Sequence, residues 1–238
     1  MVEISINTRH DPENLNGIYR KTGRLQVKNF FPENVADELF GLISQNQTWF
    51  TAYNEGENYF EIPHSGMAKM TPQQRQQFWH KIQKGARDGF QYFFDQYYMT
   101  DAIMNGREEG HALHQMHDFV NSDEFLNFMR TLTGVEEIDR SDSFASRYMP
   151  GHFLTTHTDT HANENRVAAY TISMTRNWMP DWGGNLIFYG DDGNINGGFT
   201  PTFNTLNIFT VPQLHAVSQV APFAGGPRFS FLGWLKRA

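Results

Sequence analysis

The sequence predicts a mixed fold, in which helices in the first half of the chain are followed by a β-sandwich or β-barrel in the second half. Up to about residue 139, apolar residues recur at helical spacing in three segments. From Ser143 onward, short segments rich in β-branched and aromatic residues are separated by Gly, Pro, Asn and Asp, as in strands joined by turns. The 238 residues are 39% hydrophobic and 15% aromatic, so the chain can supply a large core.

Two of the predicted helices lie before residue 100. The first spans residues 32–45 and presents on one face Val35, Leu39, Leu42 and Ile43. The second begins at Thr71-Pro72, because an N-cap threonine followed by proline is a common helix start. Gly85 and Gly89 weaken its middle, so we expect a bend or a break there. Its apolar stripe is formed by Phe78, Ile82, Ala86, Phe90, Phe93, Phe94 and Tyr97.

A third helix and seven strands complete the predicted elements. Ser122 is the predicted N-cap of this helix and Gly134 its C-terminal cap, and its core-facing residues are Phe125, Phe128, Met129 and Leu132. The strands are expected at residues 144–148, 153–156, 167–174, 186–189, 206–211, 216–220 and 229–235. Since no linker or repeat separates the halves, we expect one domain, 1–238. A mostly helical supporting part (1–139) would pack on a β-rich core (140–238).

Composition and charge exclude several classes of function. The absence of cysteine rules out disulfides, thiolate metal sites, iron–sulfur clusters and cysteine nucleophiles. A net charge of -7 argues against a nucleic-acid partner. The start of the chain has no signal-peptide pattern, and no segment approaches the ~20 apolar residues that span a bilayer. We therefore expect a cytoplasmic protein without a membrane partner, and the sequence makes no prediction of its oligomeric state.

The motif HTDTH, at residues 157–161, is the strongest candidate for a metal site. His157 and Asp159 are two residues apart, so their side chains would point to the same side of an extended strand. His215 follows another predicted strand and is the candidate third ligand. Two histidines and one carboxylate on one face of an octahedral ion leave three positions open, which is the arrangement of non-haem Fe(II) enzymes that activate oxygen.

Spacing alone leaves two alternatives for this motif. His161 could complete a zinc-like site with His157 and Asp159, or all of these residues could be polar groups of the surface. A second histidine cluster is formed by His111, His114 and His117. Residues spaced three apart do not stay on one face of a helix, so we interpret these histidines as structural. The functional alternatives are a second metal site or a substrate-facing lid.

Four ordered segments carry a family resemblance. They are RYMPGHFLTTHTD, RVAAYTISMTRNWMPDWGGNLIFY, TFNTLNIFTVPQLHAVSQV and GPRFSFLGWL. Together they resemble the Fe(II)- and 2-oxoglutarate-dependent oxygenases of the prolyl-4-hydroxylase-like branch, over residues 140–238. Residues 25–39, LQVKNFFPENVADEL, more weakly resemble the strand and helix at the start of the same proteins. The resemblance implies a double-stranded β-helix (a jelly-roll, cupin-like fold) as the catalytic core, flanked by the N-terminal helices.

The resemblance also implies the ligands and the chemistry. His157, Asp159 and His215 would bind Fe(II), with 2-oxoglutarate and O2 as cosubstrates and ascorbate as a stimulant. In relatives that halogenate, the position of Asp159 carries a small residue, so hydroxylation is expected here. Leu154 departs from the branch, which often has an aromatic residue three positions before the first ligand.

The cosubstrate contacts follow from the last segment. Arg228 would pair with the distal carboxylate of 2-oxoglutarate, which Tyr148 and Ser230 would also contact. A guanidinium can form two parallel hydrogen bonds with a carboxylate. Strand alternation in RFSFLGW puts Arg228 and Ser230 on one face, which supports this assignment.

The expected reaction is hydroxylation of an unactivated C–H bond in a prolyl or other residue of a protein, with release of succinate and CO2. The alternatives are oxidation of a free amino acid or other small metabolite, and a non-oxygenase jelly-roll protein that binds zinc or another metal. The segments 53–67, 105–117 and 177–182 are expected around the mouth of the site. The candidate substrate-binding residues are Arg147, Arg166, Arg176, Trp178, Trp182 and His161.

Overall fold

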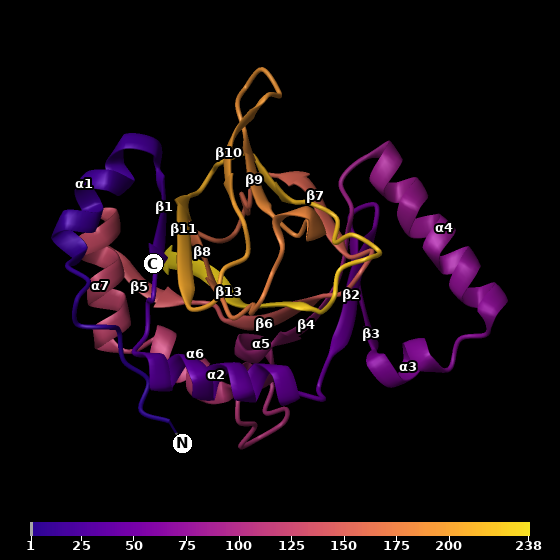
Figure 1. Ribbon diagram of the computed structural model, residues 1–238, viewed down its shortest axis with the longest axis horizontal. Helices are drawn as coiled ribbons and strands as arrows, with labels where there is room; N and C mark the ends of the chain where they lie inside the picture. Colours follow the sequence, from indigo (N-terminus) through magenta and orange to yellow (C-terminus); the bar gives the residue numbers. More distant parts are fainter. Residues whose placement is uncertain (1) are drawn as a thin grey trace.

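The computed structural model describes residues 2–238, whose strands form one antiparallel sheet that curls into a nearly closed, jelly-roll-like barrel (Figure 1). The strands are β1 (Arg24–Lys28), β2 (Phe50–Glu55), β3 (Asn58–Pro63), β4 (Tyr92–Tyr98), β5 (Ile138–Ser141), β6 (Phe144–Tyr148), β7 (Phe153–His157), β8 (Arg166–Ser173), β9 (Leu186–Tyr189), β10 (Ile195–Phe199), β11 (Thr205–Thr210), β12 (His215–Val217) and β13 (Arg228–Arg237). The helices are α1 (Pro12–Thr22), α2 (Glu33–Gln45), α3 (His64–Ala68), α4 (Pro72–Asp88), α5 (Met99–Met104), α6 (His114–Val120) and α7 (Asp123–Thr133), with a 3-10 turn, Pro180–Trp182.

The sheet mixes strands from both halves of the chain. Its order is β1-β11-β8-β13-β6-β4-β7-β12-β9-β10, with β2 and β3 extending from β4 and β5 pairing with β13. The strand β4 therefore lies between β6 and β7, and β1 closes against β11. Residues 1–139 therefore contribute two strands of this continuous order, β1 and β4, in addition to the helices.

The largest error of the sequence-based prediction concerns residues 90–97. The second helix begins as predicted, with a capping box between Thr71 and Gln74, but α4 ends at Asp88. The aromatic residues that follow belong to β4, where Tyr92, Phe94, Gln96 and Tyr98 face the interior of the barrel. Both faces of β4 are rich in aromatic residues. The apolar residues of this segment therefore fit the periodicity of a helix as well as that of a strand.

The remaining predicted elements are confirmed with shifted ends. The helix α7 begins after Ser122, whose side chain accepts a hydrogen bond from the backbone N–H of Phe125, and ends at Gly134 with φ 74°. Residues 25–39 form β1 and α2, as the resemblance implied. All seven predicted strands are present, although the one predicted at 216–220 ends at Val217. The elements α1, α3, α5, α6, β2, β3, β5 and β10 were not predicted.

Helices cover the outside of the barrel at two ends and along one face. In Figure 1, α1 and α7 lie together at the left of the sheet, α2, α5 and α6 lie below it, and α4 stands at the right. Phe78 and Trp79 of α4 pack against Phe93 of β4. Among residues 2–238, no helix combines the length and the apolar character needed to cross a membrane.

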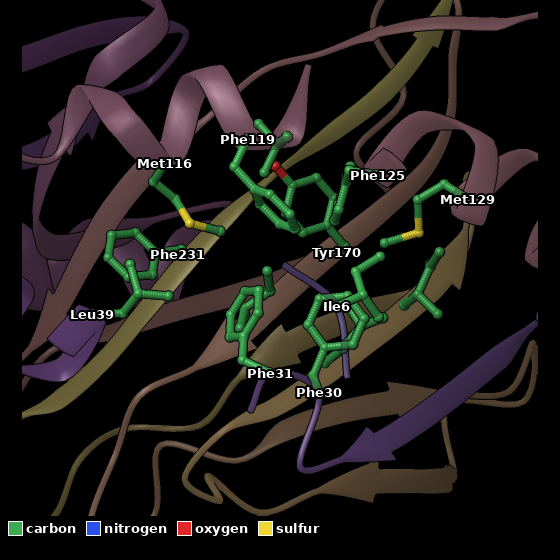
Figure 2. Packing of buried hydrophobic residues seen from close by; sticks show 14 of the residues in the cluster. Ile6, Phe30, Phe31, Leu39, Met116, Phe119, Phe125, Met129, Tyr170 and Phe231 are labelled. Atoms are coloured by element: carbon green, nitrogen blue, oxygen red, sulfur yellow. The ribbon is translucent and has the colours of Figure 1, made fainter. Parts of the chain in front are cut away.

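The main core lies between these helices and the outer face of the sheet. Figure 2 shows Phe119, Phe125 and Met129 from the helices grouped around Tyr170 of β8, with Phe231 of β13 nearby. The ring of Phe125 lies 5.4 Å from that of Tyr170, edge to face. This layer braces one side of the sheet, so the opposite, inward-facing side chains are free to form a cavity.

Truncation of Phe125 tests how strongly this layer supports the barrel. Phe125 is fully buried and contacts the rings of Phe30, Phe119 and Tyr170. Phe125→Ala should lower the free energy of unfolding by about 3–5 kcal/mol, since it leaves a cavity that the neighbouring rings cannot fill. Urea denaturation measures the change. The exposed Phe223 provides the control, because Phe223→Ala should change the stability by less than about 0.5 kcal/mol. A loss below about 1 kcal/mol for Phe125→Ala would contradict the prediction.

Candidate active site

The three predicted metal ligands converge at one end of the barrel. His157 ends β7 and His215 begins β12, and these two residues are direct partners in the antiparallel ladder. Asp159 Oδ1 lies 3.1 Å from Nε2 of His157, and Oδ2 lies 3.3 Å from Nε2 of His215. One donor atom from each residue lies within 4.8 Å of the others. Among residues 2–238, this is the one group of three such donors, and His161 lies outside it.

The position of Asp159 has a different cause from the one predicted. The strand β7 ends at His157, so Asp159 is not on an extended strand. Its φ of 59° places it in the left-handed region, which aspartate tolerates better than most residues. The side chain of Arg166 donates a hydrogen bond of 3.2 Å to the carbonyl oxygen of Asp159 and steadies this turn. The turn, and not strand alternation, therefore aims the carboxylate at the histidines.

Backbone contacts fix which nitrogen of each histidine faces the centre. Nδ1 of His157 lies 2.9 Å from the carbonyl oxygen of Thr155, and Nδ1 of His215 lies 2.8 Å from that of Gln213. A carbonyl oxygen only accepts, so both Nδ1 atoms carry a proton, and the Nε2 atoms, which face Asp159, are the ones that would bind a metal. Burial alone would raise the pKa of Asp159, but the two imidazoles hold that pKa well below its usual value. Two imidazole Nε2 atoms and an ionised carboxylate form a donor set that suits Fe(II).

The second part of the site surrounds Arg228 on β13. This residue is only 4% exposed, and its guanidinium lies over the ring of Tyr148, 4.9 Å from the ring centroid. No ion pair among residues 2–238 includes Arg228, and its Nε and the hydroxyl of Ser230 have no hydrogen-bond partner. Burial lowers the pKa of Arg228, partly offset by Tyr148. A buried guanidinium without an anion is costly, so this arrangement fits a ligand that carries a carboxylate.

Ser173 belongs to the same surroundings, although it is not among the residues predicted from the sequence. The register of the sheet places Ser173 of β8 directly opposite Ser230, and Ser146 of β6 lies on the other side of Ser230. Ser173 is 1% exposed and its hydroxyl lacks a partner. A serine in phase with the cavity-facing Ala169 and Thr171 of the same strand was the signal that could have identified it.

The glycine pair of the second family segment has a packing role beside Arg228. Gly183 and Gly184 have φ of 69° and 63°, a region in which other residues are strained. A Cβ atom on Gly184 would lie 3.1 Å from Cδ of Arg228 and 3.3 Å from the ring of Trp178. The absence of a side chain at Gly184 therefore lets both Trp178 and Arg228 pack closely against this turn.

Comparison with known proteins agrees with this geometry. Residues 143–236 match the model of the 2OG-Fe(II) oxygenase superfamily. This part of the chain is therefore similar to the 2OG-Fe(II) oxygenase superfamily. The matched residues include all three predicted iron ligands, Arg228 and Ser230, and the enzyme class that follows is a 2-oxoglutarate-dependent dioxygenase. None of the curated proteins matches the sequence of this oxygenase significantly.

Solved structures show the same fold at low sequence identity. A prolyl-4-hydroxylase from Pseudomonas putida superimposes with a TM-score of 0.60 at 17% identity, over 96% of this chain and 100% of that one. A prolyl hydroxylase from Trichoplax adhaerens, in complex with a fragment of hypoxia inducible factor, gives 0.62 at 15% identity, over 95% and 90%. The non-heme alpha ketoglutarate dependent epimerase SnoN gives 0.59 at 10% identity, over 95% and 83%. These likenesses show that the oxygenase has the prolyl-4-hydroxylase-like barrel fold.

The three predicted metal ligands and Arg228 open into one cavity. Its volume is ≈ 720 Å³, and the inward-facing residues of β4, β6, β8 and β13 line it. Three further predicted residues line it as well, namely Tyr148, Arg166 and His161. The cavity is large enough for 2-oxoglutarate together with part of a second molecule.

Two of the predicted substrate-binding arginines lie outside the cavity lining. Arg147 alternates to the outer face of β6, where it forms an ion pair of 2.8 Å with the buried Asp95 and lies over the ring of Trp49. Arg176 pairs with Asp37 and lies over the ring of Phe203. Both arginines already have partners, so the structure gives no support to a role for them in substrate binding.

The two tryptophans and the second histidine cluster are also outside the cavity lining. Trp178 packs on the cluster that contains Tyr148, and its Nε1 donates to the carbonyl oxygen of Gly183 at 2.9 Å. Trp182 contacts Trp178 edge to face, with ring centroids 5.3 Å apart. Of the three clustered histidines, His114 hydrogen-bonds the hydroxyl of Tyr97, and His117 that of Ser143, both at 2.8 Å. These contacts hold helices on the outside of the sheet.

Proposed function

We propose that the chain binds Fe(II) through His157, Asp159 and His215, and 2-oxoglutarate through Arg228 with Tyr148, Ser230 and Ser173 beside it. One observation carries the proposal: a buried guanidinium without an anion faces the same cavity as a group of two histidines and a carboxylate. The superfamily match of residues 143–236 supports both halves of this assignment.

The chain's own residues would position and protect the reaction. Arg228 fixes one carboxylate of 2-oxoglutarate and so orients the other end of the molecule toward the histidines. The contacts of His157 and His215 with backbone carbonyls keep their Nε2 atoms ready for the metal. The aromatic wall of the cavity excludes water. When bound, Fe(II) with 2-oxoglutarate and O2 supplies the oxidation in which R–H, O2 and 2-oxoglutarate give R–OH, succinate and CO2.

The proposed substrate is an amino-acid residue in a protein, a prolyl or another one. The fold likeness to two prolyl hydroxylases supports this choice, one of them bound to a peptide fragment. The cavity also opens beside Tyr59 and Phe90, which are 52% and 47% exposed and could contact a peptide. A free amino acid or another small metabolite is the second candidate, and it is favoured by the same fold in the epimerase SnoN. We also propose that residues 1–238 act as one catalytic domain, since β4 lies within the barrel.

Product analysis tests this function. The purified protein with Fe(II), 2-oxoglutarate and O2 is offered a peptide library in one series and the free amino acids in another. A substrate should gain one oxygen atom, seen as a mass increase of about 16 Da, with one succinate formed for each product. Stimulated succinate formation in the peptide series alone supports a protein substrate. Failure of the wild-type protein to bind or consume 2-oxoglutarate under any of these conditions would contradict the proposal.

A further inference from the structure

A carboxylate on β3 faces the cavity without a cationic partner. Alternation along this strand turns Tyr59 and Glu61 toward the cavity, while Phe60 stacks on Tyr53 on the other side of the hairpin. No ion pair among residues 2–238 includes Glu61. Glu61 is therefore a negatively charged group in the wall of the cavity whose charge nothing in the described chain neutralises.

Gln96 holds this carboxylate in place. The side chain of Gln96 is only 6% exposed, and its Nε2 donates hydrogen bonds of 2.7 Å to Oε1 of Glu61 and to the hydroxyl oxygen of Tyr59. Burial and the neighbouring Glu61 raise the pKa of Tyr59, so its hydroxyl keeps its proton. The hydroxyl of Tyr59 also hydrogen-bonds the carboxylate of Glu61, and these contacts fix its orientation without neutralising its charge. The group is thus preorganised to accept a hydrogen bond from a ligand.

The other charges at the mouth of the cavity are already paired. Asp101 forms an ion pair with Arg107. Glu164 pairs with Arg166 at 2.7 Å and with Lys236 at 3.1 Å, and the guanidinium of Arg166 also lies 3.6 Å above the ring of Trp234. With Arg228 assigned to 2-oxoglutarate, the described lining offers no free arginine or lysine for a substrate carboxylate. The unmatched charge of the cavity is negative, so the complementary charge on a substrate is positive.

Aromatic rings connect this carboxylate to the predicted iron site. The ring of Phe90 lies 5.5 Å from that of His157, Tyr92 follows at 5.7 Å from Phe90, and Tyr59 lies 6.4 Å from Tyr92. An alkyl chain can lie along such rings, and a cation at its end gains from their electron-rich faces. The combination of an apolar path, aromatic rings and a fixed carboxylate matches an ammonium group on an alkyl stem.

We propose that the substrate carries an alkylammonium group, which binds to Glu61 between Tyr59 and Tyr92. This inference rests on the proposed function, because it places the ammonium group at a distance from the carbon that reacts near His157. The group could come from a lysyl side chain in a peptide or from a free amine. The lack of a free cation in the lining favours the peptide source, since the carboxylate of a free amino acid would find no partner. An internal prolyl residue, which has no charge, would leave Glu61 unused.

Three probes test the proposal by direct binding. They are Nα-acetyl-lysine N-methylamide, the matched norleucine compound that lacks the ammonium group, and free lysine. Each is titrated anaerobically by calorimetry into the protein, both without additions and with Fe(II) and 2-oxoglutarate. We expect the blocked lysine to bind about tenfold more tightly than the blocked norleucine, and this ratio to fall as salt is added. The ammonium site is supported whether blocked or free lysine binds more tightly. Tighter binding of blocked lysine indicates a peptide as the source of the ammonium group, and tighter binding of free lysine indicates a free amine.

Variants assign the preference to Glu61. Glu61→Gln keeps the shape of the side chain and its contact with Gln96, and should reduce the preference for the blocked lysine to within about twofold. Tyr59→Ala should reduce it partly, through the lost ring. Glu57→Gln removes an exposed carboxylate in the turn of the same hairpin and should retain the full preference. Thermal unfolding confirms that each variant is folded before it is titrated.

The outcomes separate this inference from the proposed function. Equal or absent binding of the two blocked probes to the wild-type protein overturns the ammonium site, and so does a full preference in folded Glu61→Gln. The same wild-type samples are assayed for 2-oxoglutarate binding. If 2-oxoglutarate binds but the preference is absent, the inference fails and the proposed function stands. If 2-oxoglutarate does not bind, the proposed function fails. The titration of the blocked probes into protein without Fe(II) and 2-oxoglutarate then still shows whether the ammonium site exists.

Discussion

His215→Ala is expected to abolish Fe(II) binding and to reduce 2-oxoglutarate turnover about a thousandfold or more. The substitution removes one of three donors whose atoms lie within 4.8 Å of one another, and no other donor of the described chain joins this group. A bound metal supplies several kcal/mol to such reactions, and each 1.36 kcal/mol corresponds to a factor of ten in rate. Metal content after anaerobic loading and succinate formation measure the two effects.

A neighbouring histidine supplies the control for this prediction. His161 lines the same cavity but lies outside the donor group, so His161→Ala should retain Fe(II). This pair of variants also decides between the two donor sets that the sequence left open. Full metal binding in folded His215→Ala, together with its loss in His161→Ala, would contradict the assignment and favour the zinc-like set.

Arg228→Met is expected to weaken 2-oxoglutarate binding by about a hundredfold without loss of stability in the ligand-free protein. A buried charge pair is worth about 2–5 kcal/mol when one partner is truncated, which corresponds to a factor of about thirty to several thousand. In the absence of an anion, however, the guanidinium is a buried charge without a partner. Its replacement by an apolar side chain of similar length should therefore leave the free energy of unfolding unchanged or raise it.

Two measurements check the prediction for Arg228. Calorimetric titration gives the affinity for 2-oxoglutarate, and urea denaturation without 2-oxoglutarate gives the stability. Arg228→Lys, which keeps the charge but loses the forked geometry, should fall between wild type and Arg228→Met in affinity. A strong destabilisation of ligand-free Arg228→Met combined with unchanged 2-oxoglutarate affinity would show that Arg228 serves the fold and not the cosubstrate.

The site residues that could be predicted from sequence are those that stand in a short motif or follow the periodicity of one strand. His157 and Asp159 stand in one short motif, and alternation in a single strand relates Arg228 to Ser230. The mechanism inferred for Asp159 was nevertheless wrong, because the ladder ends at His157 and a left-handed residue provides the convergence. A turn conformation of this kind has no signal in the pattern of apolar residues.

The features that were missed depend on pairing between distant segments. Arg147 looked free in the sequence because its partner Asp95 is 52 positions away, on a strand that was predicted to be a helix. The same error hid Gln96 and the hairpin of β2 and β3, and with them the surroundings of Glu61. Ser173 gained its significance only when the register placed it opposite Ser230.

An anaerobic titration of the purified apoprotein tests the central claim most directly. Fe(II) is added first and 2-oxoglutarate second, and the visible spectrum is recorded after each addition. We expect a weak charge-transfer band that appears only when both are present. The band should be lost in His157→Ala and should need far more 2-oxoglutarate in Arg228→Met. A folded, metal-loaded wild-type protein that shows no band at saturating 2-oxoglutarate would contradict the claim.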